Sequence, residues 1–209
     1  MKSDLELMEE FKRGDRNAFH KLIRRHHVAV LNFFYPLCGM PEFSEELTQD
    51  VFLRIFNDLD PRTEVSLWKI HRNEATHPTS RFSTYLMRTA YLCWSEYLRH
   101  NGSPVRALVP AGQASAGLAT TDSYALLAPV AEELKPVMVL AEIGGFSYAE
   151  IGVILHLPPN MVRHRMKEGY AQLQASVHAR AAGAKKTAAA GVSGPETGTS
   201  GSAAAQPGS

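Results

Sequence analysis

The sequence predicts an all-α protein with two small helical domains joined by a flexible linker. Signals that start and end helices recur along the chain, whereas signals typical of strands and hairpins do not. Apolar residues repeat at helical spacing on both sides of residues 103–122, a stretch rich in Ala, Gly, Ser, Thr and Pro that we interpret as the linker. With 44% hydrophobic and 21% charged residues among 209, the composition is that of a globular protein with a packed core.

The first domain, residues 1–102, is expected to begin with two helices. Asp4 is predicted to cap a short helix that stops at Gly14, and Asp15 to cap a longer one that runs through Phe34. The apolar stripe of the longer helix consists of Phe19, Leu22, Ile23, Val30 and Phe34.

A strongly amphipathic helix is predicted next, in "SEELTQDVFLRIFNDL". We expect Ser44 to open it, with two glutamates near the positive end of the helix dipole. Four apolar residues at a spacing of four form its buried face: Leu47, Val51, Ile55 and Leu59.

Residues 60–80 contain two prolines and scattered polar residues, so a long connection is expected there. A further helix is predicted from Phe82 to His100, because Gly102 and Pro104 follow it as stop signals.

The second domain, residues 123–180, contains a broken helical pattern. Pro136 suits the first turn of one helix, and Ser147 with Glu150 forms the S-x-x-E capping box of the next. Pro159 has no amide hydrogen and a preset φ, so it suits the first position of a new helix. This arrangement predicts a helix-turn-helix. Residues 181–209 are rich in Ala, Gly and Ser, and we expect them to be a disordered tail.

The last predicted helix has one apolar and one polar face. Val162, Met166, Gly169 and Leu173 share the first, while the opposite face is basic. Arg side chains bond guanine edges in the major groove, and Lys, His and Asn bond bases or phosphates. The candidate DNA-binding residues are Asn160, Met161, Arg163, His164 and Lys167. The alternative is a solvated charged face on an ordinary helical hairpin.

Other functional classes receive little support from the sequence. Cys38 and Cys93 lie among apolar neighbours without metal-ligand spacing, so we interpret them as structural thiols. We expect no metal and no cofactor, and no catalysis, because none of the common catalytic motifs occurs. Neither a signal-like apolar run nor a membrane-spanning one is found, which favours the cytoplasm.

Two segments together resemble a known family. "LKPVMVLAEIGGFSYAEIGVILHLPPNMVRHRMKEGYAQL" is similar to the promoter-reading C-terminal domain of bacterial extracytoplasmic-function (ECF) sigma factors, and "FSEELTQDVFLRIFNDL" with "FSTYLMRTAYLCWSEYLRH" resembles their N-terminal domain. The resemblance implies an alternative sigma factor that binds core RNA polymerase and promoter DNA, is held inactive by an anti-sigma protein, and has no membrane insertion of its own. The alternative is a helix-turn-helix regulator that does not bind polymerase.

The resemblance also implies roles for particular positions. The second domain would read the minus-thirty-five element. Residues matching the polymerase-binding helix are Glu46, Asp50, Phe52, Arg54 and Ile55. Residues matching the element that reads and melts the minus-ten region, where aromatic rings stack on unpaired bases, are Arg81, Tyr85, Arg88, Tyr91 and Trp94.

The minus-ten helix departs from the family pattern. An Arg-Asn pair common in the family is replaced by Tyr91 and Leu92, while such a pair occurs upstream at Arg72 and Asn73. We favour the first register, because "YLRH" closes the helix as it does in the family. The minus-ten base preference therefore stays open.

Overall fold

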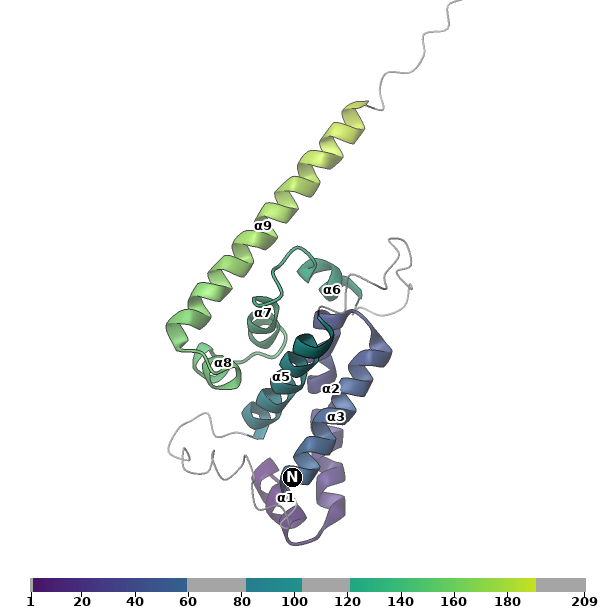
Figure 1. Cartoon of the computed structure of the whole chain (residues 1–209), viewed down its shortest axis with the longest axis vertical. Coiled ribbons are helices and arrows are strands. Elements are labelled where there is room, and N and C mark those ends of the chain that lie inside the picture. Colours follow the sequence, from purple (N-terminus) through teal and green to yellow (C-terminus); the bar gives the residue numbers. More distant parts are fainter. Residues whose placement is uncertain (1, 60–81, 103–120, 191–209) are drawn as a thin grey trace, which may run out of the picture. The chain divides into compact units, whose positions relative to one another are not determined.

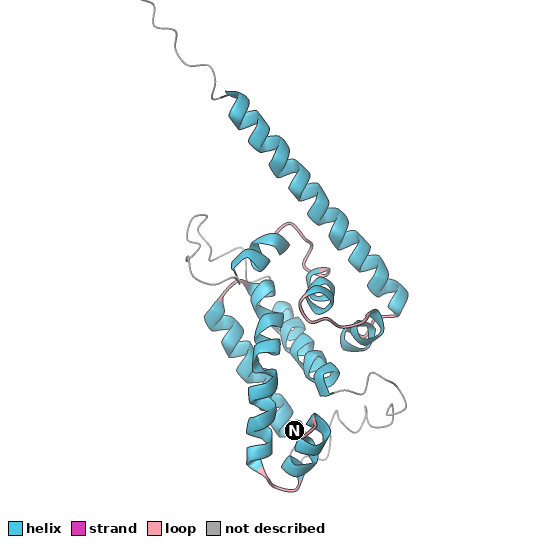
Figure 2. Cartoon of the chain, turned by 180° about the vertical axis from the view of Figure 1, so that it is seen from behind, coloured by secondary structure: helices cyan, strands magenta, loops and turns pink. Residues whose placement is uncertain are grey.

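The computed structural model describes residues 2–59, 82–102 and 121–190. Every regular element in these ranges is a helix, which confirms the predicted all-α class (Figures 1 and 2). Residues up to Leu173 form one compact unit, and those from Gln174 onward form a second. Helices from both sides of the predicted linker belong to the first unit, while the linker itself lies almost wholly outside the described ranges.

The chain begins with helices α1 (Asp4–Lys12) and α2 (Arg16–Cys38). Ser3 rather than Asp4 caps α1, because its hydroxyl accepts from the Glu6 amide while the Glu6 carboxylate accepts from the Ser3 amide. Asp15 caps α2 as predicted. Instead of ending at Phe34, α2 continues to a left-handed glycine, Gly39, at φ 71°.

Helix α3 (Pro41–Leu59) starts three residues before the predicted cap. Ser44 is buried inside the first turns, where its hydroxyl donates to the carbonyl of Met40 at 2.8 Å. Proline suits the first position of a helix, and this explains the earlier start at Pro41. The predicted apolar face is confirmed, since all four of its residues are buried: Leu47, Val51, Ile55 and Leu59.

Helix α5 (Phe82–Asn101) matches its prediction closely. It packs against α2 and α3 in the first half of the chain and against α8 in the second half. The long connection predicted for residues 60–80 lies outside the described residues.

The second half contains α6 (Thr121–Leu127), α7 (Lys135–Glu142), α8 (Tyr148–Leu155) and α9 (Pro159–Ala190). Pro136 lies in the first turn of α7, as predicted. Helix α9 differs from the prediction, because it continues past Arg180 to Ala190. The added segment is rich in alanine, the residue with the highest helix propensity.

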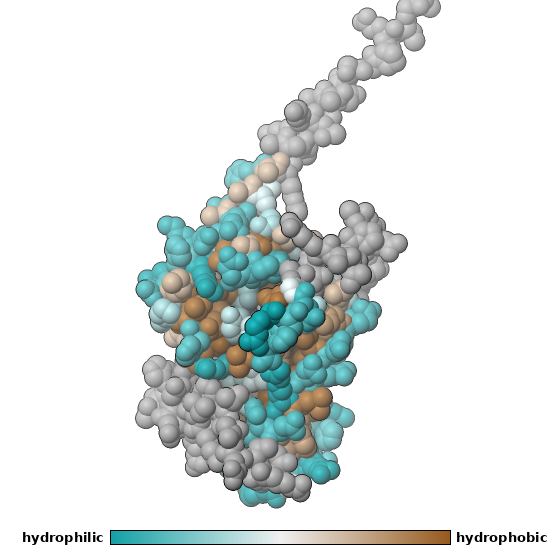
Figure 3. Space-filling model, in the orientation of Figure 1, coloured by the Kyte–Doolittle hydropathy of each residue, from teal (hydrophilic) through white to brown (hydrophobic). Residues whose placement is uncertain are grey.

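Buried apolar side chains form the core, and hydrophilic residues cover much of the described surface (Figure 3). Cys38 and Cys93 are both free and buried, which confirms their interpretation as buried thiols. Burial raises the pKa of Cys93 to about 11 and also raises the pKa of Cys38, so both thiols stay protonated at neutral pH. Across the described ranges, no helix is both long and apolar enough to span a bilayer.

Candidate nucleic-acid interface

A sharp turn joins α8 to α9. The predicted capping box opens α8: the Ser147 hydroxyl accepts from the Glu150 amide at 3.3 Å, and the Glu150 carboxylate accepts from the Ser147 amide at 2.9 Å. The helix ends at His156, which adopts the left-handed region at φ 57°. Pro159 then begins α9, as predicted. The break that proline introduces is therefore the turn of a helix-turn-helix.

The turn depends on a close approach at Gly152. The amide of Leu157 donates to the Gly152 carbonyl at 2.8 Å, which brings the chain back over α8. A Cβ at Gly152 would lie 2.7 Å from the Leu157 carbonyl oxygen, a distance that real Cβ atoms do not tolerate. Glycine is thus needed for the two helices to meet at this angle.

The inward face of α9 is anchored to α7 and to the residues before it. Val162 and Met166 are buried as predicted. Farther along α9, Gly169 lets the helix approach Met138 of α7, whose sulfur would lie 2.5 Å from an added Cβ. Arg165 was not among the predicted site residues. Its guanidinium donates to the Glu133 carbonyl at 3.4 Å, so it turns toward the protein rather than outward.

The outward face of α9 is exposed among the residues that the structure describes. All five predicted DNA-binding residues are exposed: Asn160, Met161, Arg163, His164 and Lys167. The Nε2 atom of His164 lies 3.9 Å from the Oε2 atom of Glu168, one helical turn farther along α9. A row of hydrogen-bond donors on the first turns of a well-anchored helix suits the edges and phosphates of a DNA groove.

The predicted minus-ten residues are placed less uniformly. Tyr85 and Trp94 are only 4% and 1% exposed, and the Tyr85 hydroxyl donates to Asp58 at 3.0 Å. Burial raises the pKa of Tyr85, so its hydroxyl keeps its proton. Stacking on a base requires an exposed ring face, and neither residue presents one in this structure.

The other three members of the minus-ten set differ from these two. Tyr91 is half-buried. Arg88 is also half-buried and donates to the Val153 carbonyl of α8 at 3.3 Å. Arg81 lies outside the described residues. Among the described members of the minus-ten set, only Arg88 and Tyr91 are therefore partly exposed to solvent.

The predicted polymerase-binding residues of α3 divide into surface and core. Glu46 and Asp50 are exposed, whereas Phe52 and Ile55 are buried. Arg54 is exposed and pairs with Glu96 of α5, and this hydrogen bond lowers the pKa of the Glu96 carboxyl. Phe52 and Ile55 therefore belong to the core, and the other three residues of the set lie on the surface of α3.

An exposed leucine on α3 was not among the predicted site residues. Leu53 is 60% exposed, although it lies on the polar side of the helix, three residues after Asp50 and seven after Glu46. It borders a groove of about 480 Å³ between α2 and α3. Apolar residues in the lining of this groove are Phe19, Ile23, Phe52, Leu53 and Phe56. A lone large apolar residue in a polar face is the sequence signal that could have pointed to it.

Comparisons with known proteins agree with this geometry. The family model described as "Sigma-70, region 4" matches residues 125–173, which contain the helix-turn-helix. Two solved structures share the fold. CnrH, solved in complex with the cytosolic domain of CnrY, is 21% identical with a TM-score of 0.63 over 85% of this chain and 99% of that one. The sigma factor RpoE, solved with the anti-sigma factor NepR from Bartonella quintana, is 14% identical with a TM-score of 0.56 over 77% and 96%.

Sequence relatives extend the match across most of the chain. The RNA polymerase sigma factor CarQ of Myxococcus xanthus is 26% identical over 179 residues, which cover 80% of this chain and 93% of CarQ. The ECF RNA polymerase sigma factor SigE of Mycolicibacterium smegmatis is 28% identical over 177 residues, or 77% of this chain and 63% of SigE. The chain therefore contains a sigma-70 region 4 helix-turn-helix and is similar to ECF sigma factors across both of its halves.

Proposed function

We propose that this chain is an alternative sigma factor that binds core RNA polymerase and directs it to specific promoters. The observation that carries this function is the helix-turn-helix, whose α9 is anchored on one face and exposes five potential DNA contacts on the other. The protein acts in the cytoplasm by binding alone, and the polymerase supplies the catalysis.

The roles divide along the chain. Residues 123–180 read the minus-thirty-five element through the outward face of α9. Residues 1–102 bind polymerase through the exposed face of α3 and contact the minus-ten region through α5, where Arg88 and Tyr91 have surface to offer. Residues 103–122 connect the two parts.

A regulatory partner fits the same proposal. CnrH and RpoE, which have a similar fold, were each solved in complex with a second protein, which in the case of RpoE is an anti-sigma factor. We infer that an anti-sigma protein likewise holds this chain inactive by covering its polymerase-binding and DNA-binding faces.

Run-off transcription tests the proposed function. Core polymerase is mixed with genomic fragments, with and without the purified chain, and transcripts are mapped at their starts. We expect discrete starts that depend on the chain. If the chain shifts promoter fragments in a gel but neither co-elutes with core polymerase nor yields transcripts, it is a helix-turn-helix regulator that does not bind polymerase.

Substitutions on the exposed face of α3 should weaken polymerase binding. Leu53→Asp removes an exposed apolar side chain beside the α2–α3 groove, and Asp50→Lys reverses a neighbouring charge. Loss of an apolar anchor at an interface typically costs on the order of 2 kcal/mol, so affinity should fall about 30-fold for Leu53→Asp. Surface plasmon resonance with immobilised core polymerase measures it.

A matched control separates this interface from general effects of the substitution. Leu126→Asp makes the same change at a residue that is 57% exposed on α6, outside the proposed interface. We expect Leu126→Asp to bind polymerase like the wild type. Equal binding by Leu53→Asp, Asp50→Lys and the wild type would place the polymerase contact elsewhere.

Two outward residues of α9 should contribute to DNA binding in different ways. Arg163→Ala should cost about 1 to 3 kcal/mol at the cognate minus-thirty-five element and relax preference at one base pair, because it removes a bidentate bond to a base edge. Lys167→Ala should weaken binding to all sequences alike and reduce the salt slope by about one, because it removes a phosphate contact. Holoenzyme binding to a panel of promoter variants at several salt concentrations measures both. If neither variant differs from the wild type, the basic face of α9 is merely solvated.

A further inference from the structure

The first half of α2 carries a group of basic side chains without acidic partners. Arg16, Lys21 and Arg24 are exposed, and no described residue forms an ion pair or hydrogen bond with any of the three. His20 and Asn17 lie between them. At ~100° per residue, the five side chains fall within an arc of about 140° around the helix. We call this surface the α2 basic face.

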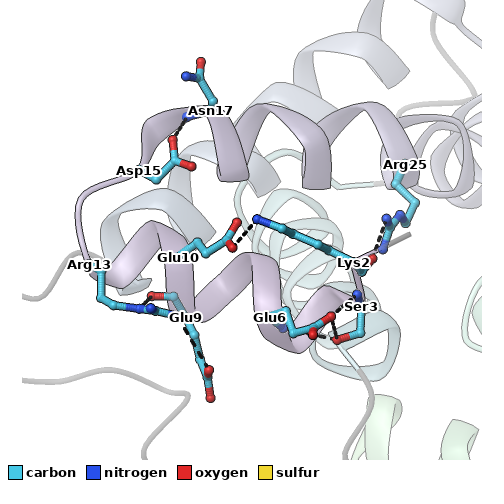
Figure 4. Close-up of polar contacts among 9 residues, drawn as sticks. All are labelled: Lys2, Ser3, Glu6, Glu9, Glu10, Arg13, Asp15, Asn17 and Arg25. Carbon is cyan, nitrogen blue, oxygen red and sulfur yellow. Dashed lines mark hydrogen bonds and ion pairs between the residues drawn. The ribbon is translucent and has the colours of Figure 1, made fainter.

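Other basic side chains in the same region are paired. Arg13 bonds Glu9, Lys2 bonds Glu10, and the Arg25 guanidinium reaches the backbone carbonyl of Lys2 (Figure 4). Arg25 also pairs with Asp4. Acidic groups are therefore available around α1, yet they serve these partners and leave the α2 basic face uncompensated.

The helix dipole makes the placement of the basic face more unfavourable still. Helix α1 has acidic residues in its first turn and Lys12 in its last, as the dipole favours. Helix α2 is capped by the Asp15 carboxylate, but its first turn contains no acidic residue and Arg16 occupies its first position. Positive side chains near the N-terminus of a helix interact unfavourably with the positive end of the helix dipole, and they also repel one another. Folding stability alone does not explain this arrangement, whereas binding an anion does.

The chemistry of the surface favours phosphate over protein as the ligand. Asn17, His20, Lys21 and Arg24 line a hollow of about 600 Å³, and every one of these side chains can donate hydrogen bonds. Protein interfaces are organised around buried apolar or aromatic anchors, and the lining of this hollow has none. Arg16 and His20 line the neighbouring apolar α2–α3 groove, so Lys21 and Arg24 are the charged residues that distinguish the hollow from that groove. Contacts to the DNA backbone need only charge and donors.

We propose that the α2 basic face binds the phosphate backbone of DNA without regard to sequence. The inference rests on the proposed function in one respect, namely that the chain works on DNA. From Asn17 to Arg24 the helix rises ~10 Å, so its basic side chains can reach about two neighbouring phosphates of one strand. The surface adds affinity, while the outward face of α9 supplies base preference.

Binding of the full-length chain to a duplex tests the proposal. The probe is a fluorescent duplex of about 30 bp without promoter elements, titrated from about 50 to about 200 mM salt at chain concentrations up to about 100 μM. Lys21→Glu/Arg24→Glu should weaken binding about tenfold at the lowest salt and reduce the salt slope by about 1.8, the value for removing two phosphate contacts. Lys21→Arg/Arg24→Lys keeps the charge and should keep the slope.

A comparison with α9 separates this proposal from the proposed function. On a promoter fragment, Lys21→Glu/Arg24→Glu should lower affinity for matched and mismatched minus-thirty-five sequences by the same factor, whereas Arg163→Ala changes their ratio. Circular dichroism confirms that each variant is folded.

Three results would each overturn the assignment. The first is that the wild-type chain fails to bind the duplex up to about 100 μM, the weak end of non-specific affinity, and the second is that the charge reversal leaves the salt slope unchanged. The third is that a polyglutamate peptide binds the wild type more tightly than the duplex does and loses affinity in the reversal variant, which would assign the surface to an acidic protein instead.

Discussion

Val162→Asp is expected to unfold the helix-turn-helix and to abolish promoter recognition. The Val162 side chain is fully buried on the inward face of α9, among the apolar residues of the core. A buried carboxylate without a partner is among the few substitutions that cost more than about 4 kcal/mol, a large share of a small domain's stability. Urea unfolding followed by circular dichroism should show loss of the cooperative transition, or a strongly lowered midpoint.

The neighbouring residue provides the control. Met161 is 41% exposed on α9, about 100° around the helix from Val162, so Met161→Asp should change stability by only about 0.5 kcal/mol. Its carboxylate would face DNA phosphates, however, and affinity should fall although the protein stays folded. A Val162→Asp protein that unfolds at the wild-type urea concentration would mean that α9 does not seat on α7 in solution.

The helix-turn-helix could be predicted because its signals are local. The capping box at Ser147 and Glu150 and the proline at residue 159 each act within one helical turn, and the structure has all three in their expected roles. The inward position of Val162 followed from helical periodicity alone. What the sequence did not indicate was the close approach at Gly152, which depends on where the chain returns.

The first residues of helices were harder to predict from the sequence, because a serine can act in two ways near a helix start. Serine caps a helix by accepting from an amide, yet its hydroxyl can equally donate to a carbonyl one turn back within a helix. Ser3 caps α1 by accepting from the Glu6 amide, whereas Ser44 donates to the Met40 carbonyl within α3. At Ser44 the choice is decided by Pro41, which starts the helix earlier.

Long-range contacts left no local pattern at all. The bond from Arg88 to the Val153 carbonyl joins helices that are far apart in sequence. Leu53 is a different case, because a lone leucine in the polar face of α3 is a local signal, although Leu53 was not among the predicted site residues. Aromatic residues posed a related difficulty, since a ring that fills a core and a ring that stacks on a base have the same composition and the same helical spacing.

Trp94 is the residue at which this ambiguity has the largest energetic consequence. It is 1% exposed, and its ring stacks on Tyr97 with centroids 5.9 Å apart. Trp94→Ala should therefore destabilise the protein by about 3 to 5 kcal/mol, the usual range for deleting a buried aromatic ring. Urea unfolding monitored by circular dichroism measures the change in the free energy of unfolding.

Trp94→Phe separates the packing role from a role on DNA. The indole N–H is buried without a partner among the described residues, so phenylalanine removes a donor whose unpaired burial costs about 1 to 3 kcal/mol. This gain offsets part of the weaker packing of the smaller ring, and the net change should be about 1 kcal/mol or less. If Trp94 acts only in the core, the Trp94→Phe variant should support run-off transcription from both duplex and pre-melted promoter templates. The Trp94→Ala variant should lose activity on both templates, because its folded fraction falls. If Trp94→Phe is folded yet fails only on the duplex template, then Trp94 acts in opening DNA, and α5 must expose its ring before the promoter melts.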